Sequence, residues 1–320
     1  MKEIAILTGG DSNEYEISIQ SAKIVLNNLN KEKYNGTIIH LKNGVFTTYS
    51  DNKKINTKDL TITINESKIQ FDFVFIALHG PPAENGDIQK LFDKLKIPYS
   101  SCSSSISEMT FNKFKCNNKL KELGFNCANS LLYIRNDHIN NDYIIKELKL
   151  PVFVKPNQSG SSLGISKVKK KSDLKSAIQE ALLFDENIII EEYINGIELS
   201  CGVLRIKKKI ITLPITEIIS ENEFFDYKAK YEGMSQEITP AKISEEIAIN
   251  IRKITTNIYE KLDLRGVCRI DFILKNKIPY IIEINTIPGL SQESIIPKQA
   301  KEAGISLKEL FDYCIENTIE

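Results

Sequence analysis

The chain has 320 residues, in which 42 lysines and arginines balance 42 aspartates and glutamates to a formal net charge of +0 at pH 7. This length exceeds that of one typical compact core, so we expect two or three domains that share a cleft. Because no single-sign electrostatic field is present to attract nucleic acid or anionic lipid, we expect small-molecule substrates and neither a nucleic-acid nor a membrane partner.

Six cysteines are scattered through the chain without any Cys-x-x-Cys pair, which is typical of reduced thiols that pack as small hydrophobic groups. No apolar run approaches the roughly 18 residues of a membrane span. Residues 1–10 are predicted to form a short strand and not a signal peptide. These features predict a cytoplasmic protein.

The N-terminal part of the chain alternates strand and helix patterns. Apolar residues 4–7 predict a buried strand, Gly9-Gly10 a turn, and residues 16–29 a helix with one apolar face. Residues 73–78 form a second continuous apolar run, which a His-Gly-Pro-Pro loop and another amphipathic helix follow. We therefore expect a small parallel α/β domain, of Rossmann-like type, over residues 1–100.

Two further domains are expected, over residues 101–192 and 193–320. The serine-rich stretch at 100–105 has the composition of a boundary, and Ser107 is predicted to cap a helix that ends near Gly124. The predicted strands cover residues 151–155, 165–168, 188–191, 197–205 and 210–216; helices are predicted after Ser172 and Ser244, and a polar-aromatic loop at about 218–238.

Two apolar runs near the C-terminal end are joined by a short turn, which predicts antiparallel strands over residues 267–274 and 279–285. Because side chains alternate faces along a strand, Arg269 and Asp271 share one face of the first strand. For the same reason Glu283 and Asn285 share one face of the second strand. Each unpaired charge within an apolar strand costs several kcal/mol, so these groups need partners.

Two interpretations of this strand pair stay open. One is a structural pair between an arginine and a carboxylate. The other is a magnesium site in which Asp271, Glu283 and Asn285 supply hard oxygen ligands. In the second case Arg269 faces a reacting phosphate or an oxyanion.

A loop rich in Gly and Ser at residues 159–164 lies between two predicted strands, and backbone N–H groups in such a loop can wrap a phosphate. A hairpin turn without a ligand is the alternative. Lys155 on the preceding apolar strand favours the phosphate, because a lysine there is costly unless an anion is close. The sequence contains no G-x-x-x-x-G-K-[ST] motif.

Three other features allow two interpretations each. Glu191 and Glu198 follow an isoleucine run and fit either a solvated strand end or carboxylates that bind the hydroxyls of a ribose. His79 can simply end a strand with a hydrogen-bonded imidazole. In residues 224–231 charged side chains alternate with aromatic ones, which favours a lid over a core strand.

The order of these motifs, from Lys155 and its loop through the two glutamates to the polar strand pair, resembles the ATP-grasp fold. Four segments further resemble the D-alanine–D-alanine ligase family: residues 9–18, His79-Gly80, residues 225–231 and residues 285–289. The likeness spans nearly the whole chain. It implies an α/β and α+β fold, with an ATP-grasp fold following the N-terminal parallel domain.

The family resemblance also implies an activity, cofactors and partners. The enzyme would join two D-alanines through an acyl phosphate, with ATP cleaved to ADP and phosphate, to supply the dipeptide for peptidoglycan. Two Mg²⁺ ions, which Mn²⁺ could replace, would assist, and the chain would form a homodimer. The N-terminal domain would bind the first D-alanine, the central region the nucleotide phosphates, and the C-terminal region the metal ions beneath a lid.

Single residues take roles from the same resemblance. Glu14 would hold the ammonium of the first D-alanine in a network with Ser161 and Tyr231. The other substrate contacts would be His79, Ser294 and Ile295. The contacts to ATP would be Lys113, Lys155, Ser162, Glu191, Glu198 and Lys230. The metal ligands would be Asp271, Glu283 and Asn285, and the oxyanion donors would be Arg269 and the backbone N–H of Gly289.

Departures from the family pattern and alternative functions remain. Ala83-Glu84-Asn85-Gly86 stands where the family usually has Gly-Glu-Asp-Gly, and Phe225 stands where a tyrosine is frequent. The phenol of Tyr231 resembles that of dipeptide-forming members, so we expect an amide product and not a D-lactate ester. One alternative is another ATP-grasp carboxylate–amine ligase, which would have no use for Glu14 and Ser294. The other is a nucleotide-binding regulatory protein that binds ATP without phosphate release dependent on D-alanine.

Overall fold

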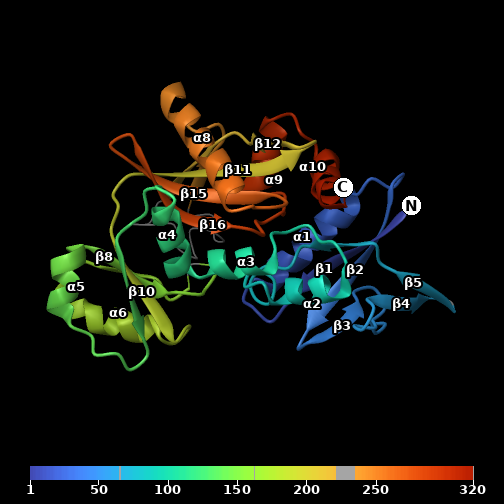
Figure 1. The fold of residues 1–320 in the computed structure, drawn as a ribbon, viewed down its shortest axis with the longest axis horizontal. Helices are drawn as coiled ribbons and strands as arrows, with labels where there is room; N and C mark the ends of the chain where they lie inside the picture. The colour runs from blue at the N-terminus through green and yellow to red at the C-terminus, as the bar shows by residue number, and fades with distance from the viewer. Residues whose placement is uncertain (65, 162, 221–234, 320) are drawn as a thin grey trace.

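The computed structural model describes residues 1–64, 66–161, 163–220 and 235–319. Three lobes follow one another along the chain in Figure 1, coloured from blue through green to orange and red. The green lobe lies at one end of the longest axis, and the labels of both chain ends lie toward the other end. The blue lobe lies at this second end, and the orange and red lobe lies along the middle, with α10 beside the blue lobe.

The N-terminal lobe is built on a sheet of order β3-β2-β1-β6. Strand β1 pairs in parallel with both β2 and β6, and its apolar run is buried as predicted. The antiparallel edge strand β3 and a small β4-β5 hairpin are additions that the sequence did not predict. The elements are β1 (Lys2–Gly9), α1 (Tyr15–Asn28), β2 (Tyr34–Lys42), β3 (Val45–Thr48), β4 (Thr61–Ile64), β5 (Ser67–Gln70), β6 (Phe73–Ile76) and α2 (Asp87–Leu95).

The prediction of one helix that begins at Ser107 is wrong, because two helices occupy this segment. Helix α3 (Ser104–Phe111) ends at Asn112, and α4 (Lys113–Glu122) begins directly after it. Ser107 is buried within α3, whereas the side chain of Asn112 caps α4 by accepting the Lys115 N–H at 3.0 Å. The break puts Lys113 in the first turn of α4.

The central lobe is an antiparallel sheet of order β7-β10-β8-β9. Its core contains Ile188 and Ile190 of β10, together with Val152 and Val154 of β8. The isoleucine run therefore forms a strand as predicted, and the structure places this strand in the interior of the sheet. The elements are β7 (Ser130–Ile134), α5 (Asn141–Leu148), β8 (Val152–Pro156), β9 (Ser166–Val168), the short 3-10 helix η1 (Lys171–Asp173), α6 (Leu174–Ala181) and β10 (Asn187–Glu192).

The C-terminal lobe is a sheet of order β14-β13-β11-β15-β16, with β12 also paired to β11. The single strand predicted at 210–216 is wrong, because it divides into β12 and β13 around Pro214, which lacks the N–H that a continuous ladder needs. The elements are β11 (Ile197–Ile206), β12 (Lys209–Thr212), β13 (Thr216–Ser220), β14 (Ser235–Ile238), α8 (Glu245–Lys261), β15 (Cys268–Lys275), β16 (Ile278–Asn285), α9 (Ile295–Glu302) and α10 (Leu307–Ile319).

Shared cores join the lobes. Ile4 and Phe75 of the N-terminal sheet pack in one cluster with Leu310 and Phe311 of α10. Helices α3 and α4 pack into the core beneath β11 and β15, so the first part of the region predicted as the central domain is buried with the C-terminal sheet. All six cysteines are free and buried, as predicted. None of the helices in the described part of the chain is long and apolar enough to cross a membrane.

Candidate active site

Strands β15 and β16 form the antiparallel pair that the sequence predicted. Their register places Arg269 opposite Asn285, and Asp271 opposite Glu283. All four polar side chains therefore lie on one face of the sheet, as the period-two pattern requires. An irregularity in the register follows directly after Asp271.

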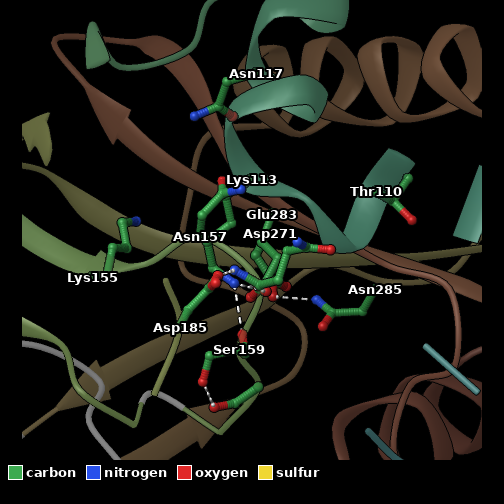
Figure 2. Close-up of polar contacts among 12 residues, drawn as sticks. Thr110, Lys113, Asn117, Lys155, Asn157, Ser159, Asp185, Asp271, Glu283 and Asn285 are labelled. Carbon is green, nitrogen blue, oxygen red and sulfur yellow. Dashed lines mark hydrogen bonds and ion pairs between the residues drawn. The ribbon is translucent and has the colours of Figure 1, made fainter. Parts of the chain in front are cut away.

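Asp271 is held by polar groups on both of its carboxylate oxygens. Arg269 binds it in a bidentate manner, with Nε 2.9 Å from Oδ1 and Nη2 2.8 Å from Oδ2. The Ser200 hydroxyl donates to Oδ1 at 2.7 Å, and the Asn285 amide nitrogen donates to Oδ2 at 2.9 Å; Figure 2 draws the contact with Asn285. The arginine–carboxylate interpretation is therefore present in this structure.

The guanidinium of Arg269 stays protonated in this position. Burial lowers the pKa of its guanidinium, but the charge of Asp271 and the hydrogen bonds between them outweigh burial and hold this pKa above its usual value. Arg269 also lines the cavity described below. It therefore presents a permanent positive charge that Asp271 orients.

Lys113 lies between the Gly/Ser loop and the strand pair. Its Nζ donates to the carbonyl oxygen of Ser159 at 2.7 Å and is 3.6 Å from Oε1 of Glu283. Figure 2 shows Lys113 above Glu283 and Ser159 below them. The start of α4 thus brings a cation to the meeting point of loop and sheet.

Lys155 forms an ion pair with Glu191, and both side chains are largely buried. The two residues lie on the paired strands β8 and β10, diagonally across the ladder, and Asn117 of α4 donates to Oε1 of Glu191 at 2.6 Å. Glu191 is therefore not a solvated strand end. The anion that Lys155 was predicted to need is, in this structure, the Glu191 carboxylate.

Glu198 lies further along, in β11, where it is partly buried opposite Ile273 and Ile218. It stands on a strand adjacent to β15. Ser162, Lys230, Tyr231 and Phe225 lie outside the described residues.

Two carboxylates, those of Glu14 and Glu84, approach Gly160 in the Gly/Ser loop. A Cβ on Gly160 would lie 3.1 Å from Oε2 of Glu14 and 3.8 Å from Oε2 of Glu84. Burial and the charge of Glu14 raise the pKa of Glu84 to about 8. The next loop residue, Ser161, is buried with a φ of 51°, a conformation that residues with side chains rarely adopt.

His79 is buried directly after β6, and hydrogen bonds engage both of its ring nitrogens. Nε2 is 2.9 Å from the Ser21 hydroxyl, and Nδ1 is 3.1 Å from the carbonyl oxygen of Ile287. Burial lowers the pKa of the imidazole, so the ring is neutral at pH 7. These contacts agree with the hydrogen-bonded strand-end interpretation; the predicted contact of His79 with substrate stays a prediction.

Gly289 and Ser294 lie against each other after β16. A Cβ on Gly289 would come within 2.7 Å of the Ser294 hydroxyl, and this hydroxyl is 2.8 Å from that of Ser291. Ile295 follows as the buried first residue of α9. Backbone N–H and hydroxyl groups are thus gathered at the start of this helix.

One cavity of about 460 Å³ collects most of the predicted residues. Those that line it are Glu14, His79, Lys113, Ser161, Arg269, Glu283, Asn285, Gly289, Ser294 and Ile295. Asp271 does not line it, and neither do Lys155, Glu191 and Glu198. Segments nearly 300 residues apart therefore meet around one space that is open to small molecules.

Sequence reasoning missed Glu84, which lines this cavity, and two polar groups that hold other predicted site residues. Glu84 was noted only as part of a departing loop, although an acidic residue between an apolar strand and a helix is itself a signal. Ser200 and Asn117 were missed because their contacts join segments 71 and 74 residues apart. No local pattern reports such distant pairs.

The sequence matches two family models, one after the other along the chain. Residues 3–102 match the model described as the N-terminus of D-ala D-ala ligase, and residues 120–316 match that of its C-terminus. The chain belongs to the D-alanine–D-alanine ligase family. Its fold is accordingly the ATP-grasp fold with an N-terminal α/β domain, as predicted.

Individual members of the family match over almost their whole length. The D-alanine–D-alanine ligase of Flavobacterium johnsoniae is 48% identical over 319 residues, which are 99% of each chain. The crystal structure of D-alanyl-alanine synthetase A from Vibrio cholerae superposes with a TM-score of 0.89 at 26% identity, covering 99% of this chain and 98% of that one. The Bacillus anthracis ligase complexed with ATP gives a TM-score of 0.81 at 28% identity, covering 100% and 97%.

Proposed function

We propose that this chain is an ATP-dependent ligase that joins two D-alanines to D-alanyl-D-alanine, with release of ADP and phosphate, for the supply of cell-wall peptidoglycan. The observation that carries the proposal is the cavity in which Glu14, Lys113 and Arg269 converge. A carboxylate suited to an ammonium, a lysine suited to a phosphate and an arginine suited to an oxyanion are the groups that this reaction needs. Family membership supports the same activity.

The first step transfers the γ-phosphoryl group of ATP to a carboxylate oxygen of the first D-alanine. In our proposal Glu14 holds the ammonium of this amino acid, and Ser161 and Tyr231 complete the network around it. Lys113 and Lys155 neutralise the phosphates, while Glu191 and Glu198 bind the adenosine part. Lys155 exchanges its partner Glu191 for phosphate when ATP binds. Ser162 and Lys230 are assigned to the phosphates through the family resemblance.

The second step is attack of the neutral amine of the second D-alanine on the acyl phosphate. The tetrahedral oxyanion receives hydrogen bonds from Arg269 and from the N–H of Gly289, and such donors are typically worth ~3–4 kcal/mol each. Ser294 binds the carboxylate of the second D-alanine, and Ile295 packs beside it. Phosphate then leaves with the oxygen that it took from the first D-alanine.

The residues on β15 and β16 fit divalent metal ions. Asp271, Glu283 and Asn285 carry the hard oxygen atoms that Mg²⁺ prefers. Among the described residues no group of three or more His, Cys, Asp or Glu side chains surrounds a metal position. This donor set is therefore partial, as expected where nucleotide phosphates and waters complete the coordination. When bound, Mg²⁺ offsets the charge of the transferring phosphoryl group.

Other attributes follow the family. We infer that two Mg²⁺ ions are used and that Mn²⁺ can replace them, that the chain forms a homodimer, and that it acts in the cytoplasm. Residues 1–100 bind the first D-alanine, 101–192 the nucleotide phosphates and 193–320 the metal ions. Size-exclusion chromatography with light scattering tests the dimer.

A screen of phosphate release over D- and L-amino acids, with ATP and Mg²⁺, tests the activity. We expect release with D-alanine and none with L-alanine, and a product with the mass of the dipeptide. Glu14→Gln removes the charge that holds the ammonium and should lose most activity, whereas Glu16→Gln, at an exposed residue in the first turn of α1, should not. If the protein binds ATP but releases no phosphate with any of the amino acids tested, a non-catalytic nucleotide-binding protein is favoured.

A further inference from the structure

Two buried serines on one face of α1 contact His79. Ser18 and Ser21 are three residues apart and fully buried. The Ser18 hydroxyl accepts the backbone N–H of His79 at 2.9 Å and donates to the carbonyl oxygen of Glu14 at 3.0 Å. The Ser18 hydroxyl thus connects His79, which follows β6, to the start of α1 by hydrogen bonds.

The direction of each hydrogen bond to the imidazole follows from its partners. The Ile287 carbonyl oxygen can only accept, so Nδ1 of His79 carries the proton. Because burial keeps the ring neutral, Nε2 is an acceptor and the Ser21 hydroxyl donates to it. The Ser21 oxygen in turn accepts the backbone N–H of Leu290 at 3.4 Å. A continuous relay therefore runs from Leu290 N–H through Ser21 and His79 to Ile287.

This relay holds both ends of a short loop. Residues 287–290 follow β16 and lie in neither helix nor strand, and Pro288 has no backbone N–H to contribute. Between the two fixed ends stands Gly289, whose N–H faces the reaction in the function proposed above. A buried pair on the N-terminal lobe thus fixes a backbone donor that belongs to the C-terminal lobe.

We propose that Ser21 and His79 are positioning residues that set the Gly289 N–H against the oxyanion and tie it to the lobe that carries Glu14. The inference rests on the proposed ligase function. Neither side chain needs to touch the reacting atoms. A shift of a catalytic donor by about 1 Å can cost on the order of 10²-fold in rate, so loss of the relay lowers kcat more than it raises KM for ATP.

Ser21→Ala removes the relay hydroxyl with little change of volume. We expect kcat for dipeptide formation to fall at least about tenfold, with KM for ATP within about twofold. Ser107→Ala is the matched control, because Ser107 is equally buried but lies in α3, bonded to Gln89 and the Cys102 carbonyl. Its kcat should stay within about twofold of the wild type, with a similar loss of thermal stability.

Rescue and tautomer measurements separate positioning from simple stability. Ser21→Thr keeps a hydroxyl and should recover kcat to within about threefold of the wild type. Nitrogen-15 NMR of the wild-type imidazole should find Nδ1 protonated and Nε2 unprotonated near pH 7, and this readout does not depend on activity or on any variant folding. The Nε2–H tautomer, or equal kcat for Ser21→Ala and Ser107→Ala, would overturn the proposal. A wild type that forms no dipeptide would instead refute the ligase function.

Discussion

At the scale of single residues, Asp271 belongs to a structural ion pair and is also one of our proposed metal ligands. Arg269 holds both of its oxygens, which satisfies a buried charge and at the same time directs the guanidinium at the cavity. Removing either partner would leave the other charge buried and uncompensated. Of the two interpretations left open by the sequence, the structural pair is observed, and the metal site that would use the same carboxylate stays a proposal.

Glu283 gives a cleaner test of the metal assignment than Asp271, because it lines the cavity. Its ion pair with Lys113 is long, with 3.6 Å between Oε1 and Nζ. Glu283→Gln keeps the shape but removes the charge available to a cation. We expect ligase turnover to fall by at least about 10²-fold, since electrostatic stabilisation dominates such transfers. Steady-state phosphate release with saturating Mg²⁺ measures it. Glu260→Gln, on the exposed face of α8, is the control; unchanged turnover in Glu283→Gln would defeat the assignment.

Glu84 predicts a pH dependence of stability. Its carboxyl has a pKa of about 8 in the folded chain, raised by burial and by Glu14 from an ordinary value of 4.5. Between these values the folded state binds a proton that the unfolded chain does not, so stability falls as pH rises from about 5 to 8. Glu84→Gln removes this loss.

The midpoint of thermal unfolding, measured from pH 5 to pH 8.5, checks this prediction. The Glu84→Gln variant should gain stability relative to the wild type as pH rises, while the exposed Glu246→Gln should follow the wild type throughout. A difference between Glu84→Gln and wild type that is the same at every pH would show that Glu84 titrates normally.

At the scale of elements, α4 delivers Lys113 because Asn112 interrupts the preceding helix and caps the next. Asn112→Ala should cost about 1 kcal/mol of stability and raise KM for ATP severalfold, because the first turn of α4 frays. Asn140→Ala removes the equivalent cap of α5, where the side chain accepts the N–H groups of Asp142 and Tyr143.

The Asn140 variant should lose similar stability with unchanged KM, which isolates the effect on the nucleotide site. Chemical denaturation measures the free energy of unfolding, and initial rates at increasing ATP concentration give KM for ATP. Equal KM values in both cap variants would mean that Lys113 does not contact ATP.

The elements also show what the sequence could predict. The β15–β16 pair was predictable because a period of two, a short turn and four polar residues are all local signals. Strands β2 to β5 were missed because their apolar runs are short and are interrupted mainly by polar residues. The two-helix course of 104–122 was missed because Ser107 is as good a cap by type as Asn112, and only packing decides between them.

The residues of the candidate site were likewise predictable only where the signal is local in sequence. Residues that local motifs carry, such as Glu14 and Ser161, were found and line the cavity. The Lys155–Glu191 pair was seen as two separate features, because adjacency across β8 and β10 is set by pairing of distant segments. The relay through Ser21 was invisible, since a buried serine on a helix has no distinctive pattern.

At the scale of the whole molecule, one core joins the first lobe to the last. Phe75 of β6 and Phe311 of α10 pack edge to face with ring centroids 5.4 Å apart, and Lys33 pairs with Asp312 and Glu316 at the rim. The cavity draws its walls from both lobes, which this core joins. Unfolding of these two lobes should be cooperative.

Phe311→Ala tests this coupling. We expect a loss of about 3–5 kcal/mol in stability and unfolding of the N-terminal lobe before the central one, since the shared core loses a fully buried aromatic ring. Urea unfolding followed by hydrogen exchange measures both. Leu183→Ala, at a side chain 80% exposed, is the control and should change neither the stability nor the order in which the lobes unfold. If Phe311→Ala unfolds in a single step with the stability of the wild type, the coupling is disproved.

The central claim is that the cavity activates a D-alanine carboxylate by phosphoryl transfer from ATP. D-alanine labelled with ¹⁸O in its carboxylate, incubated with ATP and Mg²⁺, tests it most directly. Because phosphate leaves with the oxygen that attacked the γ-phosphorus, we predict one ¹⁸O in each phosphate released, and one phosphate for each dipeptide, by mass spectrometry. Dipeptide formed with unlabelled phosphate would contradict the account.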